Sequence, residues 1–398
     1  MADDHEDQTQ RGGGGGGGGG SISNKNKKMR RGAYGWLRDR WVRELVRDKH
    51  RRLVEVPYTA TLAHTVNALL ANHVSAVPVA APPGQWIGAG GSMILESDPA
   101  TGAVRKHYIG MLTMLDVLSH IAELGDHDDK DLDRWMAIPV SAIIGHSLEG
   151  LSLWTLNPNT SLIDCMETLS KGVHRALVPV ESQMNQAVSV ELVEESPGYR
   201  LLTQMDVLRF LREQQNDLKE ILSRSVAELG AISETVFAVG KHTNVMDAIK
   251  SMRAAGLSAV PVVEYLPGDQ ILQDGKGEKL VETFSATDLR SCPIALLQSW
   301  LSISVVQFKE RLAVRASNAT IAPIDRDDPG AETRRLITCY HETSMLDVID
   351  SAVSNHVHRL WVIDEEGSLN GVVSLSDMLR VVRDSVLVAE QELQVAIS

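Results

Sequence analysis

Short apolar runs and amphipathic segments alternate along the chain in an order that recurs four times. In each copy, two apolar runs of strand length follow a segment with helical spacing, and the second run ends in Ser or Thr, two residues and Asp. The four tetrapeptides are Thr113-Met114-Leu115-Asp116, Thr203-Gln204-Met205-Asp206, Ser285-Ala286-Thr287-Asp288 and Ser374-Leu375-Ser376-Asp377. Their aspartates follow one another at intervals of 90, 82 and 89 residues. One such tetrapeptide would only indicate a capped helix, but four at this spacing predict a tandem repeat.

The other elements of the repeat are also visible in the sequence. A Thr before apolar residues at helical spacing predicts capped helices at Thr160, Thr243 and Thr343, and the first copy begins with a degenerate Ala60. Two strands are predicted after the helix of each copy. The first of these two strands lies at 75–79, 174–178, 258–262 and 358–362, and the second at 108–112, 199–202, 280–284 and 371–373. Each unit is therefore predicted to run strand, helix, strand, strand, helix, with its last Asp near a helix start.

This layout resembles the cystathionine-beta-synthase (CBS) domain. Four copies in one chain resemble the gamma subunit of AMP-activated protein kinase and its plant gamma-like relatives. The matching motifs are Val357-His358-Arg359-Leu360, Ser374-Leu375-Ser376-Asp377 and Gly172-Val173-His174-Arg175, and the plant subgroup is indicated by residues 51–59 and 150–159. The resemblance covers roughly residues 36 to 385.

The resemblance implies an α/β fold in which repeats one and two form one CBS pair and repeats three and four the other. The two pairs are expected to meet as a pseudo-fourfold disc. The expected organisation is a Gly-rich, basic, disordered tail at 1–34, CBS repeats at 35–122, 135–213, 214–291 and 334–398, and a helical linker and loop at 292–333. A repeat alone would leave one sheet face exposed, so the repeats must pair.

The N-terminal segment differs from the rest of the chain. Nine consecutive glycines, Gly12 to Gly20, predict a flexible tail because they have no apolar surface to bury. Residues 25–52 carry a charge of about +9, within a chain whose net charge is -13. The cluster 27–31 could be a nuclear address, although a solvated tail is the simpler interpretation. From Trp36 to Val46, apolar residues at helical spacing predict a lead-in helix packed on the core.

Composition narrows the class of protein. At 398 residues, with 43% hydrophobic and 4% aromatic residues, the chain can form more than one aliphatic core. The negative net charge argues against a nucleic-acid partner, and no run approaches the roughly 18 apolar residues that span a membrane. Three scattered cysteines, Cys165, Cys292 and Cys339, suit a reducing compartment, so the expected location is cytoplasmic or nuclear.

The candidate binding residues come from the resemblance. A carboxylate at a helix start can accept hydrogen bonds from a ribose diol, and a His-Arg pair at a strand edge offers donors and charge to phosphates. The family pattern makes Asp116, Asp288 and Asp377 ribose ligands, and His174, Arg175, His358 and Arg359 phosphate ligands. Ser258, Ala259, Ser374 and Ser376 match further family positions, and Asp206 completes the candidate set. The alternative is that the aspartates only cap helices.

Three departures from the family pattern bear on the ligand. Ala76 stands where the family has an Arg, Met205 stands where it has a Lys, and Asp206 is an acid that the family lacks in repeat two. Each charged hydrogen bond lost would cost about 1.5–3 kcal/mol of affinity. Binding of AMP, ADP or ATP is therefore expected to be weakened, moved or changed in preference.

The chain contains no metalloprotease, serine-hydrolase or phosphate-loop motif, and the repeats leave no segment for an enzyme. The preferred hypothesis is a non-catalytic regulatory subunit that binds the catalytic alpha and the beta subunit of an energy-sensing Ser/Thr kinase, with adenine nucleotides as ligands and no required cofactor. One alternative is a scaffold of the same fold that has lost nucleotide sensing. Another is a CBS-pair protein that binds a different adenosyl ligand and acts on an unrelated enzyme.

Overall fold

The computed structural model describes residues 34–47, 53–72, 74–81, 108–124, 132–145, 153–179, 199–268, 270–292, 294–318 and 336–397. The glycine run, the basic cluster at 27–31 and residues 82–107, which lie between two predicted strands of repeat one, are outside the described residues, as are residues 319–335 of the linker and loop before repeat four.

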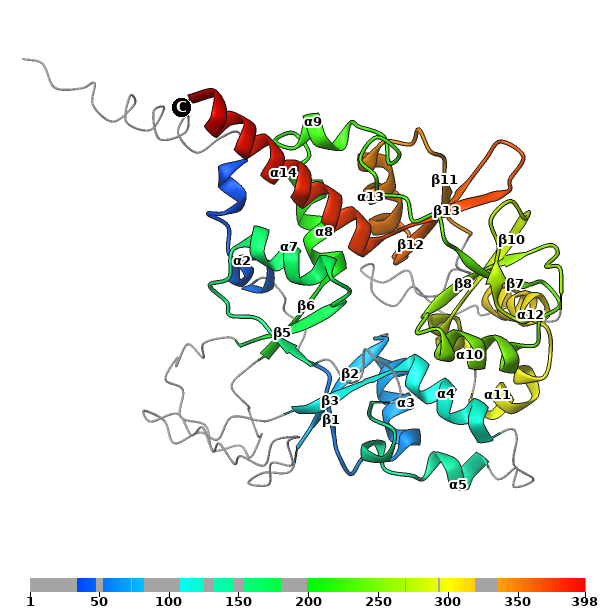
Figure 1. The fold of residues 1–398 in the computed structure, drawn as a ribbon. Coiled ribbons are helices and arrows are strands. Elements are labelled where there is room, and N and C mark those ends of the chain that lie inside the picture. The colour runs from blue at the N-terminus through cyan, green and yellow to red at the C-terminus, as the bar shows by residue number, and fades with distance from the viewer. Residues whose placement is uncertain are drawn as a thin grey trace, which may run out of the picture.

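Each repeat folds into the predicted order of elements (Figure 1). Repeat one comprises β1 (Val56–Pro57), α3 (Leu62–Ala71), β2 (Ala76–Ala80), β3 (Tyr108–Thr113) and α4 (Met114–Leu124). Repeat two comprises β4 (Trp154–Thr155), α7 (Leu162–Ser170), β5 (Arg175–Pro179), β6 (Tyr199–Thr203) and α8 (Gln204–Glu213). Repeat three comprises β7 (Phe237–Gly240), α10 (Val245–Ala254), β8 (Ala259–Val263), β10 (Leu280–Ser285) and the 3-10 helix η3 (Ala286–Ser291), with an extra strand β9 (Gln273–Asp274). Repeat four comprises β11 (Thr338–Cys339), α13 (Met345–Ser354), β12 (Arg359–Ile363), β13 (Leu369–Ser374) and α14 (Leu375–Ile397).

The same sheet is built four times. Its first strand pairs parallel with the second across the helical crossover, and the second pairs antiparallel with the third. In repeat three, β9 adds antiparallel to β7 and widens the sheet to four strands. The central strands β2 and β8 are buried along their whole length, which explains why they read as continuous apolar runs rather than as alternating ones.

The caps of the first helices lie one residue later than predicted. Their N-caps are Thr61, Ser161, Asn244 and Ser344 rather than the preceding residue of each repeat. Each side chain accepts a hydrogen bond from a backbone N–H of the first turn. The predicted Thr residues instead give backbone contacts: the carbonyl of Thr160 accepts from Val42, and that of Thr243 accepts from Val305.

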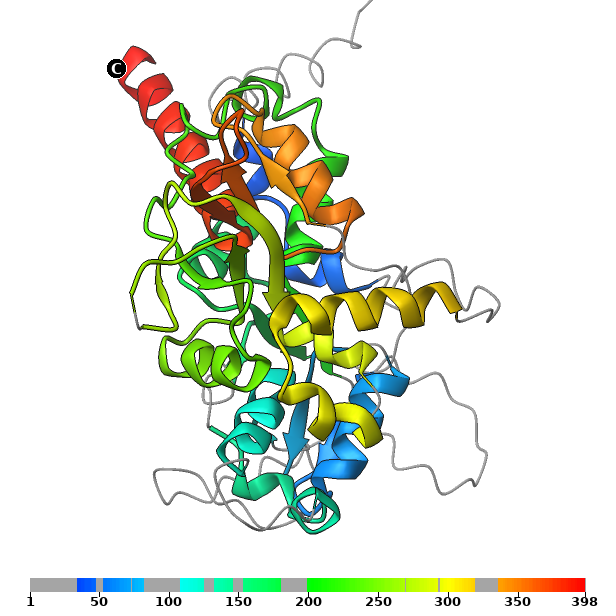
Figure 2. The ribbon, with the colours of Figure 1, turned by 90° about the vertical axis from the view of Figure 1, so that its right-hand side faces the viewer.

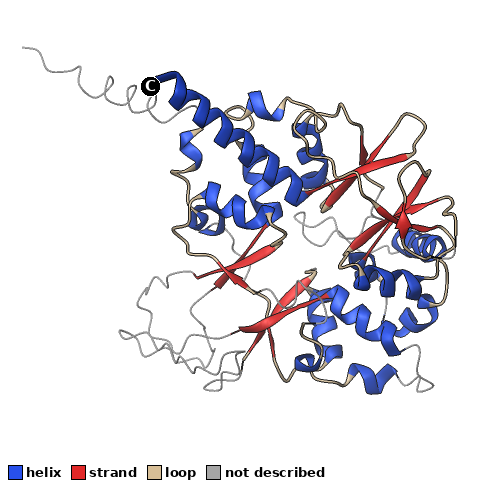
Figure 3. Cartoon of the chain, viewed as in Figure 1, coloured by secondary structure: helices blue, strands red, loops and turns tan. Residues whose placement is uncertain are grey.

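The four repeats are arranged around a common centre (Figures 1 and 3). Repeats one and two meet through their sheets, where the rings of Tyr108 and Tyr199 stand edge to face 5.6 Å apart. Repeats three and four also meet through their sheets: Ser233 bridges to Val372, and a small apolar core joins β8 to β12. The two predicted pairs are therefore confirmed.

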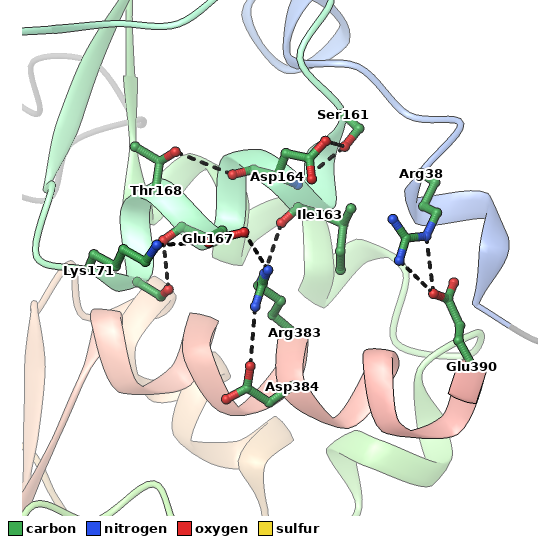
Figure 4. Close-up of polar contacts among 11 residues, drawn as sticks. Arg38, Ser161, Ile163, Asp164, Glu167, Thr168, Lys171, Arg383, Asp384 and Glu390 are labelled. Carbon is green, nitrogen blue, oxygen red and sulfur yellow. Dashed lines mark hydrogen bonds and ion pairs between the residues drawn. The ribbon is translucent and has the colours of Figure 1, made fainter. Parts of the chain in front are cut away.

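Helices join the two pairs to each other. In repeats two and four, α7 and α8 pack against α14 and α13, and one large core runs through both repeats. In repeats one and three, α4 packs against α10 and η3 around a second large core. Figure 4 shows the polar rim of the first interface, where Arg383 of α14 donates to Glu167 of α7 at 2.6 Å.

The lead-in segment contributes to the core as predicted, but not as one helix. It forms a 3-10 turn, η1 (Gly35–Leu37), and then α2 (Val42–Arg47). The break falls at Trp41, whose backbone bridges to Ser161 and so leaves helical geometry. Leu37, Val42 and Val46 are buried in the core of repeats two and four. Arg38 also donates two hydrogen bonds to Glu390 near the end of α14 (Figure 4).

The connecting segments are less regular than their sequence suggests. In the segment 214–229, which leads into repeat three, only α9 (Lys219–Leu222) is an α-helix. The linker after repeat three does form two helices, α11 (Ile294–Leu301) and α12 (Val305–Asn318), and α12 lies across the side of the molecule turned to the viewer in Figure 2. Short helices α5 (Leu132–Met136) and η2 (Val140–Ala142) connect repeats one and two. The three cysteines are buried, and no disulfide joins them in the described part of the chain.

Candidate functional site

A cavity lies where strands from all four repeats meet. Repeats two and four each contribute a His-Arg pair from the start of the central strand. Repeats one and three contribute Ser75 and Ser258 from the position that the histidines occupy. Seven of the predicted residues line this cavity together: His174, Arg175, Ser258, Ala259, Asp288, His358 and Arg359. Thr113, Thr283, Ser285, Thr287 and Trp361 also line the cavity.

The two arginines occupy equivalent places in the two pairs. Arg359 begins β12 in repeat four and reaches into repeat three, where it donates to the Ser258 hydroxyl at 2.7 Å and the Ala259 carbonyl at 2.9 Å. Arg175 begins β5 in repeat two and reaches into repeat one, where it donates to the Ser75 hydroxyl at 3.3 Å. In each pair of repeats, an arginine of one repeat thus forms hydrogen bonds with the other repeat at the cavity wall.

The environment of Arg359 is unusual for a cation. Part of its surface faces the cavity, but protein atoms surround the guanidinium closely enough that desolvation lowers its pKa to about 10. The side chain therefore stays charged at neutral pH. Its hydrogen bonds go to two neutral acceptors, and no carboxylate of the described residues forms an ion pair with it. Because a partly buried cation is stabilised by a partner of opposite charge, an anion in the cavity would complete this site.

The four aspartates of the tetrapeptides behave first as helix caps. In each repeat, one carboxylate oxygen accepts from the backbone N–H of the preceding Ser or Thr, at 2.7–3.1 Å. In repeats one, two and four, the same oxygen also accepts from that residue's hydroxyl. The capping interpretation of the tetrapeptide is thus confirmed for this contact.

The other oxygens have partners that the sequence did not indicate. Asp288 Oδ1 accepts a hydrogen bond from the ammonium of Lys309 in α12 at 3.3 Å. Asp377 Oδ1 accepts one from the guanidinium of Arg380 at 3.4 Å. Asp206 lies 3.7 Å from Arg209. Asp116 is fully buried. Only Asp288 among the four lines the cavity.

Five predicted residues lie away from the cavity lining: Asp116, Asp206, Ser374, Ser376 and Asp377. Asp116 is nevertheless next to it, since Thr113, Met114 and Leu115 form part of the wall. Ser374 caps α14 through Asp377. Ser376 accepts a hydrogen bond from Gln204 at 2.8 Å, so it belongs to the contact between α8 and α14.

The departures from the family pattern can now be located. Ala76 starts β2 at the position that Arg175 and Arg359 hold in β5 and β12, and it is buried. Repeats one and three therefore present alanines at this position, Ala76 and Ala259, and the cavity takes its arginines from repeats two and four. Met205 packs against the core of repeats two and four.

Two contributors were missed by sequence reasoning. Ser75 holds the repeat position of Ser258, so comparing the repeats position by position would have found it. Lys309 belongs to a linker helix outside the repeat, and no pattern in the sequence connects it with Asp288. Glu282 lies 3.9 Å from Lys309, and burial raises the pKa of this carboxyl.

The described residues contain no group of His, Cys, Asp or Glu side chains placed to hold a metal ion. None of the helices in the described part of the chain has the length and apolar character that a bilayer crossing requires.

Comparison with known proteins defines the class. The family model of the CBS domain matches residues 226–293 and 331–384, which correspond to repeats three and four. The fold is similar to that of protein MJ1225 from Methanocaldococcus jannaschii, with a TM-score of 0.54 at 18% identity over 86% of this chain and 99% of that one. The chain is a protein of CBS repeats, as the sequence predicted.

Two Arabidopsis thaliana relatives define the family within this class. The SNF1-related protein kinase regulatory subunit gamma-like PV42a is 51% identical over 85% of this chain and 93% of its own length. The PV42b protein of the same description is 49% identical over 89% of this chain and 98% of its own length. The chain belongs to this family of gamma-like regulatory subunits. Both names describe regulatory rather than catalytic subunits, which confirms the prediction of a non-catalytic protein.

Proposed function

We propose that the chain is the gamma-like subunit of a SNF1-related kinase complex and that it binds an adenine nucleotide in the central cavity. The phosphates would lie against Arg359, Arg175 and the two histidines. The observation that carries this proposal is the Arg359 guanidinium, which lines the cavity and is hydrogen bonded only to neutral acceptors among the described residues. A phosphate would supply the missing anionic partner, and charge-assisted bonds of this kind are the strong ones.

Membership of the family supports a proposal for the partners. The catalytic alpha and beta subunits are proposed to bind the outer surface, while the nucleotide reports to them through the four repeats that enclose it. A ligand held by all four repeats can change their relative placement, provided that its affinity differs between two arrangements. This gives a route from the cavity to the kinase without catalysis by the chain itself.

The experiment is calorimetric titration of the full chain with AMP, ADP and ATP. Arg175→Met should weaken binding about tenfold, since it removes one charged hydrogen-bond donor. Arg40→Met is the matched control: Arg40 is exposed and pairs with Glu44 on the lead-in segment. Equal losses in both variants would contradict the cavity as the site.

The ion pairs of the aspartates favour a second candidate. Asp288 and Asp377 are held by Lys309 and Arg380, so neither offers a free carboxylate to a sugar. A scaffold that assembles the kinase without sensing nucleotides would fit this arrangement. Copurification with alpha and beta subunits, together with no heat of nucleotide binding up to millimolar ligand, would favour the scaffold.

A further inference from the structure

The linker helix α12 places a lysine on the one tetrapeptide aspartate that lines the cavity. Lys309 Nζ lies 3.3 Å from Asp288 Oδ1, and the Asp288 side chain is 3% exposed while that of Lys309 is 10% exposed. Phe308 next to it is fully buried and packs edge to face against Phe284 and Trp300. The backbone at Lys309 is therefore held by the packing of Phe308 in the core of repeats one and three.

Both oxygens of Asp288 are engaged by this arrangement. Oδ2 accepts from the Ser285 backbone N–H at 2.8 Å, and Oδ1 accepts from Lys309. A ribose diol needs carboxylate oxygens that can accept from its two hydroxyl groups. To bind Asp288, a sugar would have to displace the ammonium of Lys309. Among the described residues, this nearly buried cation would then keep only Glu282, at 3.9 Å, as an acidic partner. Breaking a buried ion pair in this way is strongly unfavourable.

The remaining chemistry of the cavity suits phosphoryl oxygens. The described lining contains the two arginines, the two histidines and several hydroxyl groups, and its only carboxylate is Asp288. Guanidinium and hydroxyl groups donate to phosphate oxygens whatever sugar the phosphate carries. The two arginines come from different CBS pairs, so a chain of more than one phosphoryl group could be held from both sides.

We infer that Lys309 is a specificity-determining residue, which withdraws Asp288 from sugar recognition so that the cavity selects a phosphoryl chain and does not distinguish ribose from 2′-deoxyribose. Because this role presupposes the anion site proposed above, the test must separate the two. Three ligands do so: ADP, 2′-deoxy-ADP and inorganic pyrophosphate, each titrated into the full chain by calorimetry.

The expected result for the native protein is that ADP and 2′-deoxy-ADP bind within about twofold of each other and that pyrophosphate also binds. Lys309→Met should release Asp288 and create a preference for ADP over 2′-deoxy-ADP of about tenfold, the value of one hydrogen bond to a charged acceptor. Lys309→Arg keeps the ion pair and should behave as the native protein. Lys276→Met, which removes a surface pair with Glu234, controls for loss of a lysine.

The other outcomes distinguish the role of Lys309 from the proposed nucleotide site. A native preference for ADP over 2′-deoxy-ADP above tenfold, removed by Asp288→Asn, would overturn the role of Lys309 and leave the nucleotide site standing. Binding of pyrophosphate without binding of either nucleotide would overturn the proposed nucleotide function and uphold the phosphoryl-selective cavity. Binding of none of the three would overturn both. Even if a variant fails to fold, the comparison of ligands in the native protein tests whether the cavity distinguishes ribose from 2′-deoxyribose.

Discussion

The Arg359 guanidinium lies 2.7 Å from the Ser258 hydroxyl and joins repeat four to repeat three at the cavity wall. The equivalent contact in the other pair, from Arg175 to Ser75, measures 3.3 Å. A serine at the start of the central strand in one repeat thus orients the arginine of its partner repeat, in both pairs. This relationship links the repeat pattern of the sequence to the charge that the cavity presents.

Ser258→Ala should weaken nucleotide binding by about tenfold, because one charge-assisted hydrogen bond that fixes Arg359 is lost. The Ala259 carbonyl would still hold the guanidinium, so the fold should persist. Calorimetry on the variant measures the effect. Ser299→Ala is a suitable control, since that hydroxyl only donates to a carbonyl of its own helix. Native affinity in Ser258→Ala would show that this contact does not prepare the site.

Gly371→Ala should destabilise the contact between the sheets of repeats three and four. A Cβ there would lie 2.5 Å from Ile232 Cγ2 and 3.0 Å from the Ser233 carbonyl oxygen. Relief requires a backbone shift beside the bridge from Ser233 to Val372, with an expected cost of about 1–3 kcal/mol. Urea unfolding measures it. Gly240→Ala, whose Cβ would meet only Thr243 at 3.8 Å, should be close to neutral.

Much of this fold could be predicted from the sequence because the four repeats share one pattern. The second-strand predictions agree with β3, β6, β10 and β13 to within two residues, since apolar runs end at a polar tetrapeptide that caps the next helix. The helix caps were displaced by one residue, because both Thr160 and Ser161 can cap and only tertiary contacts choose between them. In repeat three the final helix is 3-10 rather than α, and its Asp288 turns to a lysine from outside the repeat.

The site was predictable only in part, because the repeat pattern does not show which residues from other parts of the chain contact it. The His-Arg pairs begin strands that the pattern located, so their convergence followed from the pairing of repeats. The partners of the aspartates depend on where α12 and α14 pack, which is a property of the assembled cores. Asp377 and Ser376 could not be separated from cavity residues by sequence, because they share the motif of Asp288.

Glu282→Gln should stabilise the protein at pH 7, and the gain should shrink as the pH falls. Burial raises the pKa of Glu282 in the folded state, so the charged form costs stability above that pKa and the cost disappears once the carboxyl is protonated. The amide keeps an oxygen that can accept from the Thr283 backbone N–H, as Glu282 does. Urea unfolding at pH 5, 6 and 7 tests this, and a gain that grows on acidification would contradict it.

Arg383→Met should weaken the interface of repeats two and four only modestly, because Glu167 is partly exposed and solvent screens its ion pair. Arg383 donates to Glu167 at 2.6 Å and to the Ile163 carbonyl at 3.3 Å, and so ties α14 to α7 (Figure 4). Lys171→Met removes the exposed pair that Glu167 makes with the C-cap residue of α7 and should have a smaller effect. Thermal unfolding of both variants gives the comparison, and equal effects would show that the contact between repeats adds nothing.

The central claim is that a phosphate of a nucleotide completes the charge of Arg359. A crystal structure of the full chain grown with ADP tests it most directly. We predict a phosphate oxygen within hydrogen-bonding distance of the Arg359 guanidinium, with Ser258 still holding the arginine. ADP bound elsewhere, or a cavity without ligand at saturating ADP, would contradict the claim.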